Sequence, residues 1–254
     1  MNNIDYKDKY FWFNIRIKTV TENLGKFTMY KKTSFVLTAI LLGCLFTSTP
    51  VVATTDVLVV QADNAELKNL IEEGKKLVDS KDYNGAIAVY QQAAQLDRKN
   101  DRIHATIGYL YTQQGNLSSA LDAYRRAIAI NPNNSDFYYA VGYIKSSKSD
   151  NKGAKEAYRR AIQLNRNNVN AYLGLGVSQV SLGDYQSALW AYEQAINLDK
   201  NNPRTYELIG SMFKQRRQMT QANKVLKKAL NLYQRGNDTE SAERIQAMLQ
   251  EIGG

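Results

Sequence analysis

The stretch DRIHATIGYLYTQQGNLSSALDAYRRAIAINPNN, residues 101–134 of a 254-residue chain, contains the pattern that decides the fold. In its first half, apolar and aromatic side chains recur at the spacing of one face of a helix. Gly115 ends this helix, as a C-terminal glycine commonly does, and Ser118 and Ser119 can cap a second one. A second apolar stripe then runs up to Ile130, so the stretch predicts two helices joined by a short turn. The stripe of the first helix consists of Ile103, Ile107, Leu110 and Tyr111.

Small residues recur along the chain at an interval of 34 positions. The glycines of this series are Gly74, Gly108, Gly142, Gly176 and Gly210. An alanine follows each glycine 12 residues later, at Ala86, Ala120, Ala154, Ala188 and Ala222, and a second alanine follows seven residues after the first. Because glycine makes up only about 7% of ordinary sequences, five at one interval indicate a tandem array. A period of 34 residues is typical of stacked helix pairs, so we expect an all-α solenoid.

The small residues have a steric reason. Two antiparallel helices joined by a short turn cross closely, and a larger side chain at the crossing would hold them apart. We therefore expect Gly108 and Ala120 to lie where the two helices of one pair meet. A large side chain stands 16 residues after each glycine and is expected to fill the space between successive units. These residues are Tyr90, Tyr124, Tyr158, Tyr192 and, in the fifth unit, Leu226.

The glycine, alanine and tyrosine positions resemble those of the tetratricopeptide repeat family. The resemblance covers residues 67–234 and implies a right-handed superhelical solenoid whose first helices line a concave groove. Residues 237–254 would then form a capping helix with a polar outer face, begun by Asn237, Asp238 and Thr239. The five units are residues 67–100, 101–134, 135–168, 169–202 and 203–236.

Residues 29–53 have the pattern of an export signal. Lys31 and Lys32 precede an apolar run from Phe35 to Phe46, and small residues end the segment at Ala53. The apolar run is shorter than the roughly 20 residues that a membrane-spanning helix needs. We therefore expect a signal peptide and a protein exported to a periplasm or thylakoid lumen. The tyrosine- and asparagine-rich units are similar to those of cyanobacterial envelope or lumen proteins.

Two alternatives stay open for this segment. It either remains uncut as a membrane anchor through residues 33–60, or Cys44, the last residue of a Leu-Leu-Gly-Cys box, carries the acyl chain of a lipoprotein. Residues 1–28 are long for a signal, so they are a non-native extension before a start at Met29 or the cytoplasmic tail of an anchor. Residues 54–66 are expected to form a linker.

The charge of the chain is mildly basic. It has 33 Lys and Arg residues against 24 Asp and Glu residues, and residues 54–254 carry 26 and 21 of these. This balance alone does not indicate nucleic acid, so we do not expect a nucleic-acid partner.

A peptide-binding surface is predicted on the first helices, where the family resemblance places the groove. Its middle is neutral and rich in tyrosine, which combines a large apolar area with one polar group. An extended peptide could stack on the rings and exchange hydrogen bonds with the hydroxyls and amides, although some rings could instead fill space between helices. The predicted residues are Tyr109, Thr112, Gln113, Tyr139, Tyr143, Ser146 and Asn170.

A second feature is a ladder of cations at one position of three second helices. It could dock on an anionic partner such as lipid headgroups or an acidic protein, or it could be a solvated helix face. The ladder consists of Arg125, Arg126, Arg159, Arg160, Lys227 and Lys228.

The sequence offers little for catalysis. Its only histidine is His104, at a position expected to be half-buried, and its only cysteine is Cys44. Cys/His catalysis and zinc sites therefore lack ligands, and no phosphate-binding or dinucleotide-binding loop is present. We expect no enzyme, metal, cofactor or small-molecule substrate. The prediction is a scaffold of the cell envelope that binds proteins or peptides during complex assembly; the alternative is the recognition subunit of an envelope enzyme or secretion machine.

Overall fold

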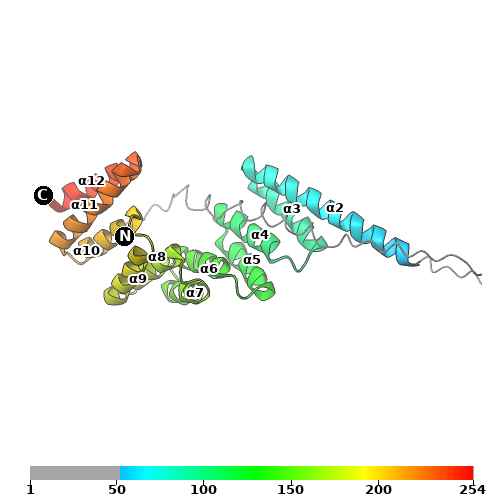
Figure 1. Ribbon diagram of the computed structural model, residues 1–254, viewed down its shortest axis with the longest axis horizontal. Helices are drawn as coiled ribbons and strands as arrows, with labels where there is room; N and C mark the ends of the chain where they lie inside the picture. The colour runs from blue at the N-terminus through cyan, green and yellow to red at the C-terminus, as the bar shows by residue number, and fades with distance from the viewer. Residues whose placement is uncertain (1–51, 254) are drawn as a thin grey trace, which may run out of the picture. The chain divides into compact units, whose positions relative to one another are not determined.

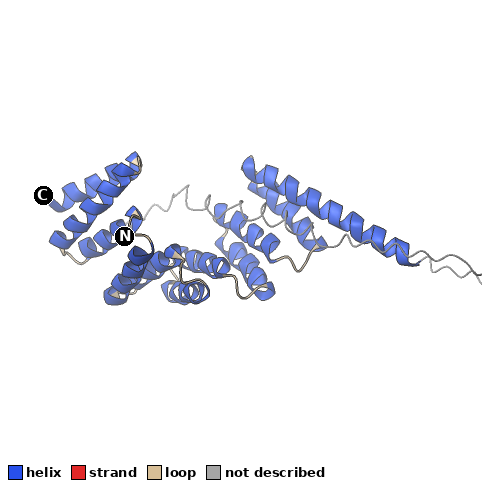
Figure 2. Ribbon diagram, in the orientation of Figure 1, coloured by secondary structure: helices blue, strands red, loops and turns tan. Residues whose placement is uncertain are grey.

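The computed structural model describes residues 52–253, and Figure 1 shows these residues as a succession of helices. No strand occurs in this part of the chain (Figure 2). Residues 51–254 form a compact unit of their own. Its helices are α2 (Val52–Asp79), α3 (Tyr83–Leu96), α4 (Asp101–Gln113), α5 (Leu117–Ile130), α6 (Ser135–Ser147), α7 (Asn151–Leu164), α8 (Val169–Ser181), α9 (Tyr185–Leu198), α10 (Pro203–Gln215), α11 (Met219–Arg235) and α12 (Thr239–Gly253).

The helices pack as pairs in chain order. The pairs α2 with α3, α4 with α5, α6 with α7, α8 with α9 and α10 with α11 are in contact, and each second helix also contacts the first helix of the next pair. The prediction of an all-α solenoid of helix pairs is therefore confirmed. The predicted signal and N-terminal extension, residues 1–28 and 29–53, lie outside the described residues except for the last two positions, which begin α2.

The expected linker differs from the structure. Residues 54–66 belong to α2, which begins at Val52 and continues without interruption to Asp79. The physical reason is that no proline or glycine stands between Val52 and Gly74 to break a helix, so the first helix of the first unit can extend toward the N-terminus.

The glycines accept a large side chain from the partner helix. A Cβ atom added to Gly108 would lie 2.7 Å from the ring of Tyr124, and one added to Gly142 would lie 2.8 Å from the ring of Tyr158. The ring of Tyr158 also lies against Gly174 of the next pair. The expectation that these rings fill the space between units is therefore corrected: each lies against the glycine of its own pair, and Tyr158 also reaches the next pair. All alanines of both series have no exposed surface: Ala86, Ala93, Ala120, Ala127, Ala154, Ala161, Ala188, Ala195, Ala222 and Ala229.

The start of the second helices corrects one sequence expectation. Asn116, rather than Ser118 or Ser119, is the N-cap of α5, and its side-chain oxygen accepts the backbone N–H of Ser119 at 3.2 Å. The helix already begins at Leu117, so both serines lie in its first turn. Asp150 caps α7 in the same way, which makes an Asn or Asp at this position a repeated helix start.

Candidate functional site

The first helices α6, α8 and α10 lie in contact across successive units. α8 contacts α6 and α10 directly, in addition to its own partner α9. We call the solvent side of α4, α6, α8 and α10 the first-helix surface. Any ligand that crosses it would touch side chains from several units at equivalent positions.

The predicted binding residues differ in exposure. On the first-helix surface, Gln113 and Asn170 are exposed, whereas Tyr109 and Tyr143 are half-buried. Burial, together with the nearby Tyr83, raises the pKa of Tyr109, so this phenol stays neutral. Thr112 and Ser146 are also half-buried at equivalent positions of α4 and α6.

Thr112 has a more restricted role than a free hydroxyl. Its Oγ1 donates to the carbonyl oxygen of Gly108 at 2.8 Å, so the proton is used within α4. Thr112 can therefore accept a hydrogen bond from a ligand but has no proton left to donate.

Tyr139 requires a correction. We expected its ring on the exposed surface, but it is only 5% exposed. Its centroid lies 5.8 Å from that of Tyr158 at a tilted angle of 48°. Burial raises the pKa of Tyr139 well above its usual range, and Tyr158 and Tyr143 add to this shift. Tyr139 is therefore part of the floor beneath the first-helix surface, not a stacking platform.

Two charged residues on α10 were missed as site candidates. Arg204 stands one repeat after Asn170, and Glu207 stands two repeats after Tyr139, so the 34-residue series could have identified both. The positive charge of Arg204 lowers the pKa of both Tyr139 and Tyr233 against the larger effect of burial. The first-helix surface is thus neutral in the middle and charged at α10.

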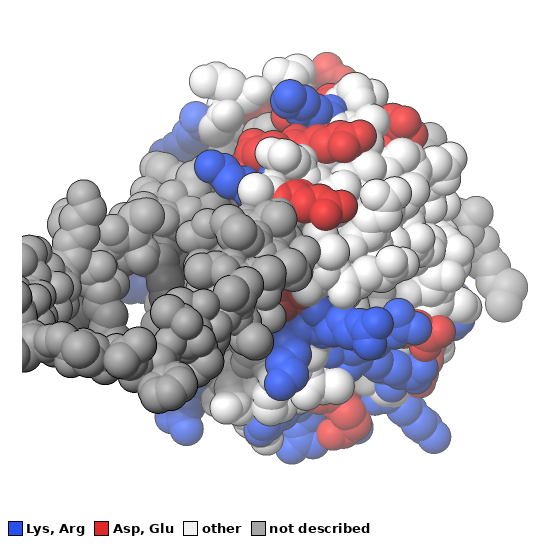
Figure 3. Space-filling view, turned by 90° about the vertical axis from the view of Figure 1, so that its right-hand side faces the viewer, with Lys and Arg blue, Asp and Glu red and all other residues white. Residues whose placement is uncertain are grey.

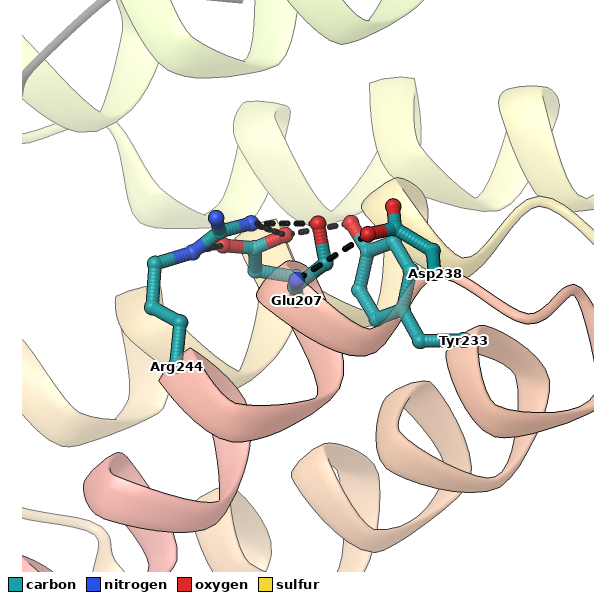
Figure 4. A network of polar contacts seen from close by, with 5 residues as sticks. Glu207, Tyr233, Asp238 and Arg244 are labelled. Carbon is teal, nitrogen blue, oxygen red and sulfur yellow. Dashed lines mark hydrogen bonds and ion pairs between the residues drawn. The ribbon is translucent and has the colours of Figure 1, made fainter.

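Glu207 links three helices, as Figure 4 shows. Its carboxylate accepts the phenol O–H of Tyr233 at 2.6 Å and the Nε–H of Arg244 at 3.2 Å. Tyr233 belongs to α11 and Arg244 to α12. Burial raises the pKa of Tyr233, and the Glu207 carboxylate raises it further. This network fastens α12 to the last helix pair.

His104 has a structural setting. It is half-buried, and its Nε2 lies 3.4 Å from the carbonyl oxygen of Arg98. Tyr206 stands three repeats after His104 and is buried. Its O–H donates to the equivalent carbonyl, that of Lys200, at 2.9 Å. Within the described chain, no three His, Cys, Asp or Glu side chains are grouped so that they could hold a metal ion. None of the helices described has the length and hydropathy needed to cross a membrane.

The stacked helix pairs and their shared first-helix surface define a helical-repeat protein. Comparison with known sequences gives the particular family. The profile described as "Cytochrome c-type biogenesis protein H TPR domain" matches residues 99–206, and a tetratricopeptide repeat profile matches residues 74–115. The chain belongs to the tetratricopeptide repeat family.

Individual relatives are consistent with this assignment. A tetratricopeptide repeat-containing protein of Picosynechococcus sp. is 36% identical over 53 residues, which span 21% of this chain and 14% of that relative. A crystal structure of MamA has a TM-score of 0.60 at 27% identity and covers 65% of this chain and 96% of its own. YrrB, described as a TPR protein with an unusual peptide-binding site, has a TM-score of 0.57 at 21% identity, with 71% and 92% covered, and shows the fold alone.

Proposed function

We propose that this chain is a non-catalytic scaffold that binds an extended peptide or a segment of a partner protein across the first-helix surface. The observation that carries the proposal is the pair Tyr109 and Tyr143, which stand at the same position of consecutive units. Both rings are half-buried, so their orientation is restricted before a ligand arrives. A ring held in this way contributes contact area at a small cost in side-chain entropy.

The surrounding groups favour a peptide as the ligand. Thr112 and Ser146 flank the two rings, and Gln113 and Asn170 add exposed amides. Hydroxyls and amides can pair with the backbone N–H and C=O groups of an extended chain, which recur along its length. Because the surface offers the same kinds of side chain at consecutive helix pairs, it suits an extended peptide, whose backbone groups recur along its length.

The cellular setting is part of the proposal. The basic and apolar pattern of residues 29–53 supports export, so we place the scaffold in the cell envelope, in a periplasm or thylakoid lumen. A membrane-anchored or lipoprotein form, held through residues 33–60 or Cys44, is the alternative setting. Complex assembly is the role that such a scaffold would serve.

A second candidate function is the recognition subunit of an envelope machine with catalysis on another chain. The match of residues 99–206 to a cytochrome c-type biogenesis family favours this version, because the matched region includes α4 to α9 and therefore the whole tyrosine pair. The two versions share the same surface and differ only in what the partner carries.

A tagged full-length chain tests the proposal. The double substitution Tyr109→Ala and Tyr143→Ala should abolish co-purification of the partner from extracts of the native cell, as read by mass spectrometry. Tyr185→Ala is the matched control, because Tyr185 is also half-buried but lies at the start of the second helix α9 and stacks with Arg216 at 5.1 Å. If the double variant retains all partners at unchanged circular dichroism, the proposal is wrong. A catalytic domain in the captured partner would select the second version.

A further inference from the structure

The cation ladder carries the charge excess of the repeat region. All six of its side chains are exposed. Residues 54–254 contain 26 basic and 21 acidic residues, so the six ladder cations exceed the net charge of the whole region. Figure 3 shows one face with most of its basic side chains in the lower part, where a few acidic ones lie among them, and a mixed acidic and basic group above a band of uncharged surface.

The two members of each ladder step are held differently. Two of the first members pair with carboxylates on their own helices: Arg125 lies 3.0 Å from Asp122, and Arg159 lies 3.9 Å from Glu156. Two of the second members, Arg160 and Lys228, lie over aromatic rings of the first helices instead. Arg160 lies 5.6 Å from the ring centroid of Tyr138. A cation over a ring face is held by the ring quadrupole while its charge remains available to a partner.

The same arrangement recurs in the fifth unit. Lys228 lies 4.1 Å from the ring centroid of Tyr206, which stands two repeats after Tyr138. Arg126 occupies the equivalent ladder position of the second unit. Arg126, Arg160 and Lys228 therefore present cations at one register along the stack.

In the unit between them, Gln194 holds the ladder position, and an exposed tryptophan four residues earlier in α9 lies against the equivalent ring. Trp190 of α9 is 51% exposed, and its ring meets Tyr172 edge-on with the centroids 6.2 Å apart. Tyr172 stands one repeat after Tyr138 and one before Tyr206. Three equivalent rings of successive first helices, Tyr138, Tyr172 and Tyr206, are therefore covered in turn by a cation, an indole and a cation. We call Arg126, Arg160, Trp190 and Lys228 the cation–indole row.

We propose that the cation–indole row docks the repeat region on the surface of a bilayer that contains anionic phospholipid. Anionic headgroups attract Lys and Arg side chains, and tryptophan is enriched at the boundary between headgroups and acyl chains. An acidic protein would satisfy the cations alone, whereas the half-exposed indole between them also fits the lipid boundary. The row lies on second helices, so the first-helix surface stays open to a peptide while the protein is docked.

A vesicle experiment tests this inference on residues 52–254, which lack the N-terminal apolar run and lie within one compact unit. The fragment should sediment with vesicles of phosphatidylserine and phosphatidylcholine but not with phosphatidylcholine alone. Replacing Arg126, Arg160 and Lys228 by Glu should lower the partition coefficient by about 100-fold. Trp190→Ala should lower it by about tenfold. The matched control replaces Lys68, Lys76 and Lys99, which are exposed cations outside the row, by Glu and should lose less than about fivefold.

Tryptophan fluorescence gives a second readout that needs no variant. The chain has two tryptophans, Trp12 and Trp190, so the fragment retains only Trp190. Its emission should shift to shorter wavelength with phosphatidylserine vesicles and become protected from iodide. An unchanged emission overturns the inference. Equal losses in the row variant and the control also overturn it, and binding to polyglutamate without binding to vesicles assigns the row to an acidic protein instead.

Discussion

The central repeats and the end of the stack differ in the side chain that packs against the glycine of the first helix. In the pairs from α4 to α9, the rings of Tyr124, Tyr158 and Tyr192 lie against glycines of the 34-residue series on their partner helices. In the last pair, Leu226 lies against Gly210 instead. The last pair is also joined to α12 by the ion pair between Glu207 and Arg244.

The difference follows from the number of neighbours. A central pair packs against a pair on each side, so a ring such as Tyr158 can touch its own unit and Gly174 of the next. The last pair has one such neighbour and a single helix, α12, on the other side. α12 buries Ala242 and Ile245 in the apolar core of the last pair, and the link to Glu207 adds polar contacts. Its outer side stays polar, as the end of a solenoid needs for solubility.

High pH should have the largest effect, because it acts on several buried rings at once. Burial raises the pKa of Tyr90 to about 12, and it also raises the pKa values of Tyr124, Tyr139 and Tyr233. The unfolded chain ionises near pH 10, while the folded chain keeps these protons. Stability is therefore unaffected below pH 10 and falls as the pH rises above it, by about 1.4 kcal/mol per pH unit for each such tyrosine.

Urea unfolding at pH 9, 10 and 11 measures this loss, which amounts to about 5 kcal/mol between pH 10 and 11 for four tyrosines. Tyr124→Phe should reduce the slope by about a quarter if the central rings carry it. A slope that Tyr124→Phe leaves unchanged would show that other groups cause the alkaline loss.

A valine at the central and terminal glycines would separate the two packing solutions. Gly142→Val should cost about 3 kcal/mol, because the ring of Tyr158 is rigid and confined by Gly174 behind it. Gly210→Val should cost about 2 kcal/mol, because the added atoms meet Cγ and Cδ2 of Leu226, whose side chain is more flexible than a ring although it is fully buried. Denaturant titration of both variants gives the comparison. Equal costs would mean that the ring and the leucine are equally confined.

The sequence predicts the features that depend on a local repeat. The helix pairs follow from apolar spacing, and the small residues follow from the closeness of two helices in one unit. The burial of Tyr139 could not be predicted in this way, since it depends on Tyr158 from a different helix. The ion pair between Glu207 and Arg244 could not be predicted for another reason. α11 has 17 residues where α9 has 14, so α12 does not keep the 34-residue register.

Removing the terminal ion pair should have a smaller and more local effect. In Arg244→Ala, Glu207 keeps its bond to Tyr233 but loses its cation, and its side chain is only 17% exposed. The cost should be about 1 kcal/mol and should fall on α12. Hydrogen exchange should show faster opening of α12 with unchanged protection of α6 to α9. Arg244→Lys should recover part of the loss, and equal opening of all helices would contradict a local role.

The smallest effect concerns the turn within each pair, where the comparison of repeats is most direct. Gly115 has a φ of +74°, and the residue at the equivalent position of the fifth unit, Arg217, has a φ of +57°. This left-handed conformation costs about 1 kcal/mol for a residue with a Cβ and little for glycine. Gly115→Ala should therefore destabilise the protein by about 1 kcal/mol, whereas Arg217→Gly should stabilise it by about 0.5 kcal/mol after the greater flexibility of glycine in the unfolded chain is included. Thermal unfolding of the two single variants and the double variant checks both signs. Because each unit contacts only its neighbours and the two turns are three repeats apart, the effects should add in the double variant.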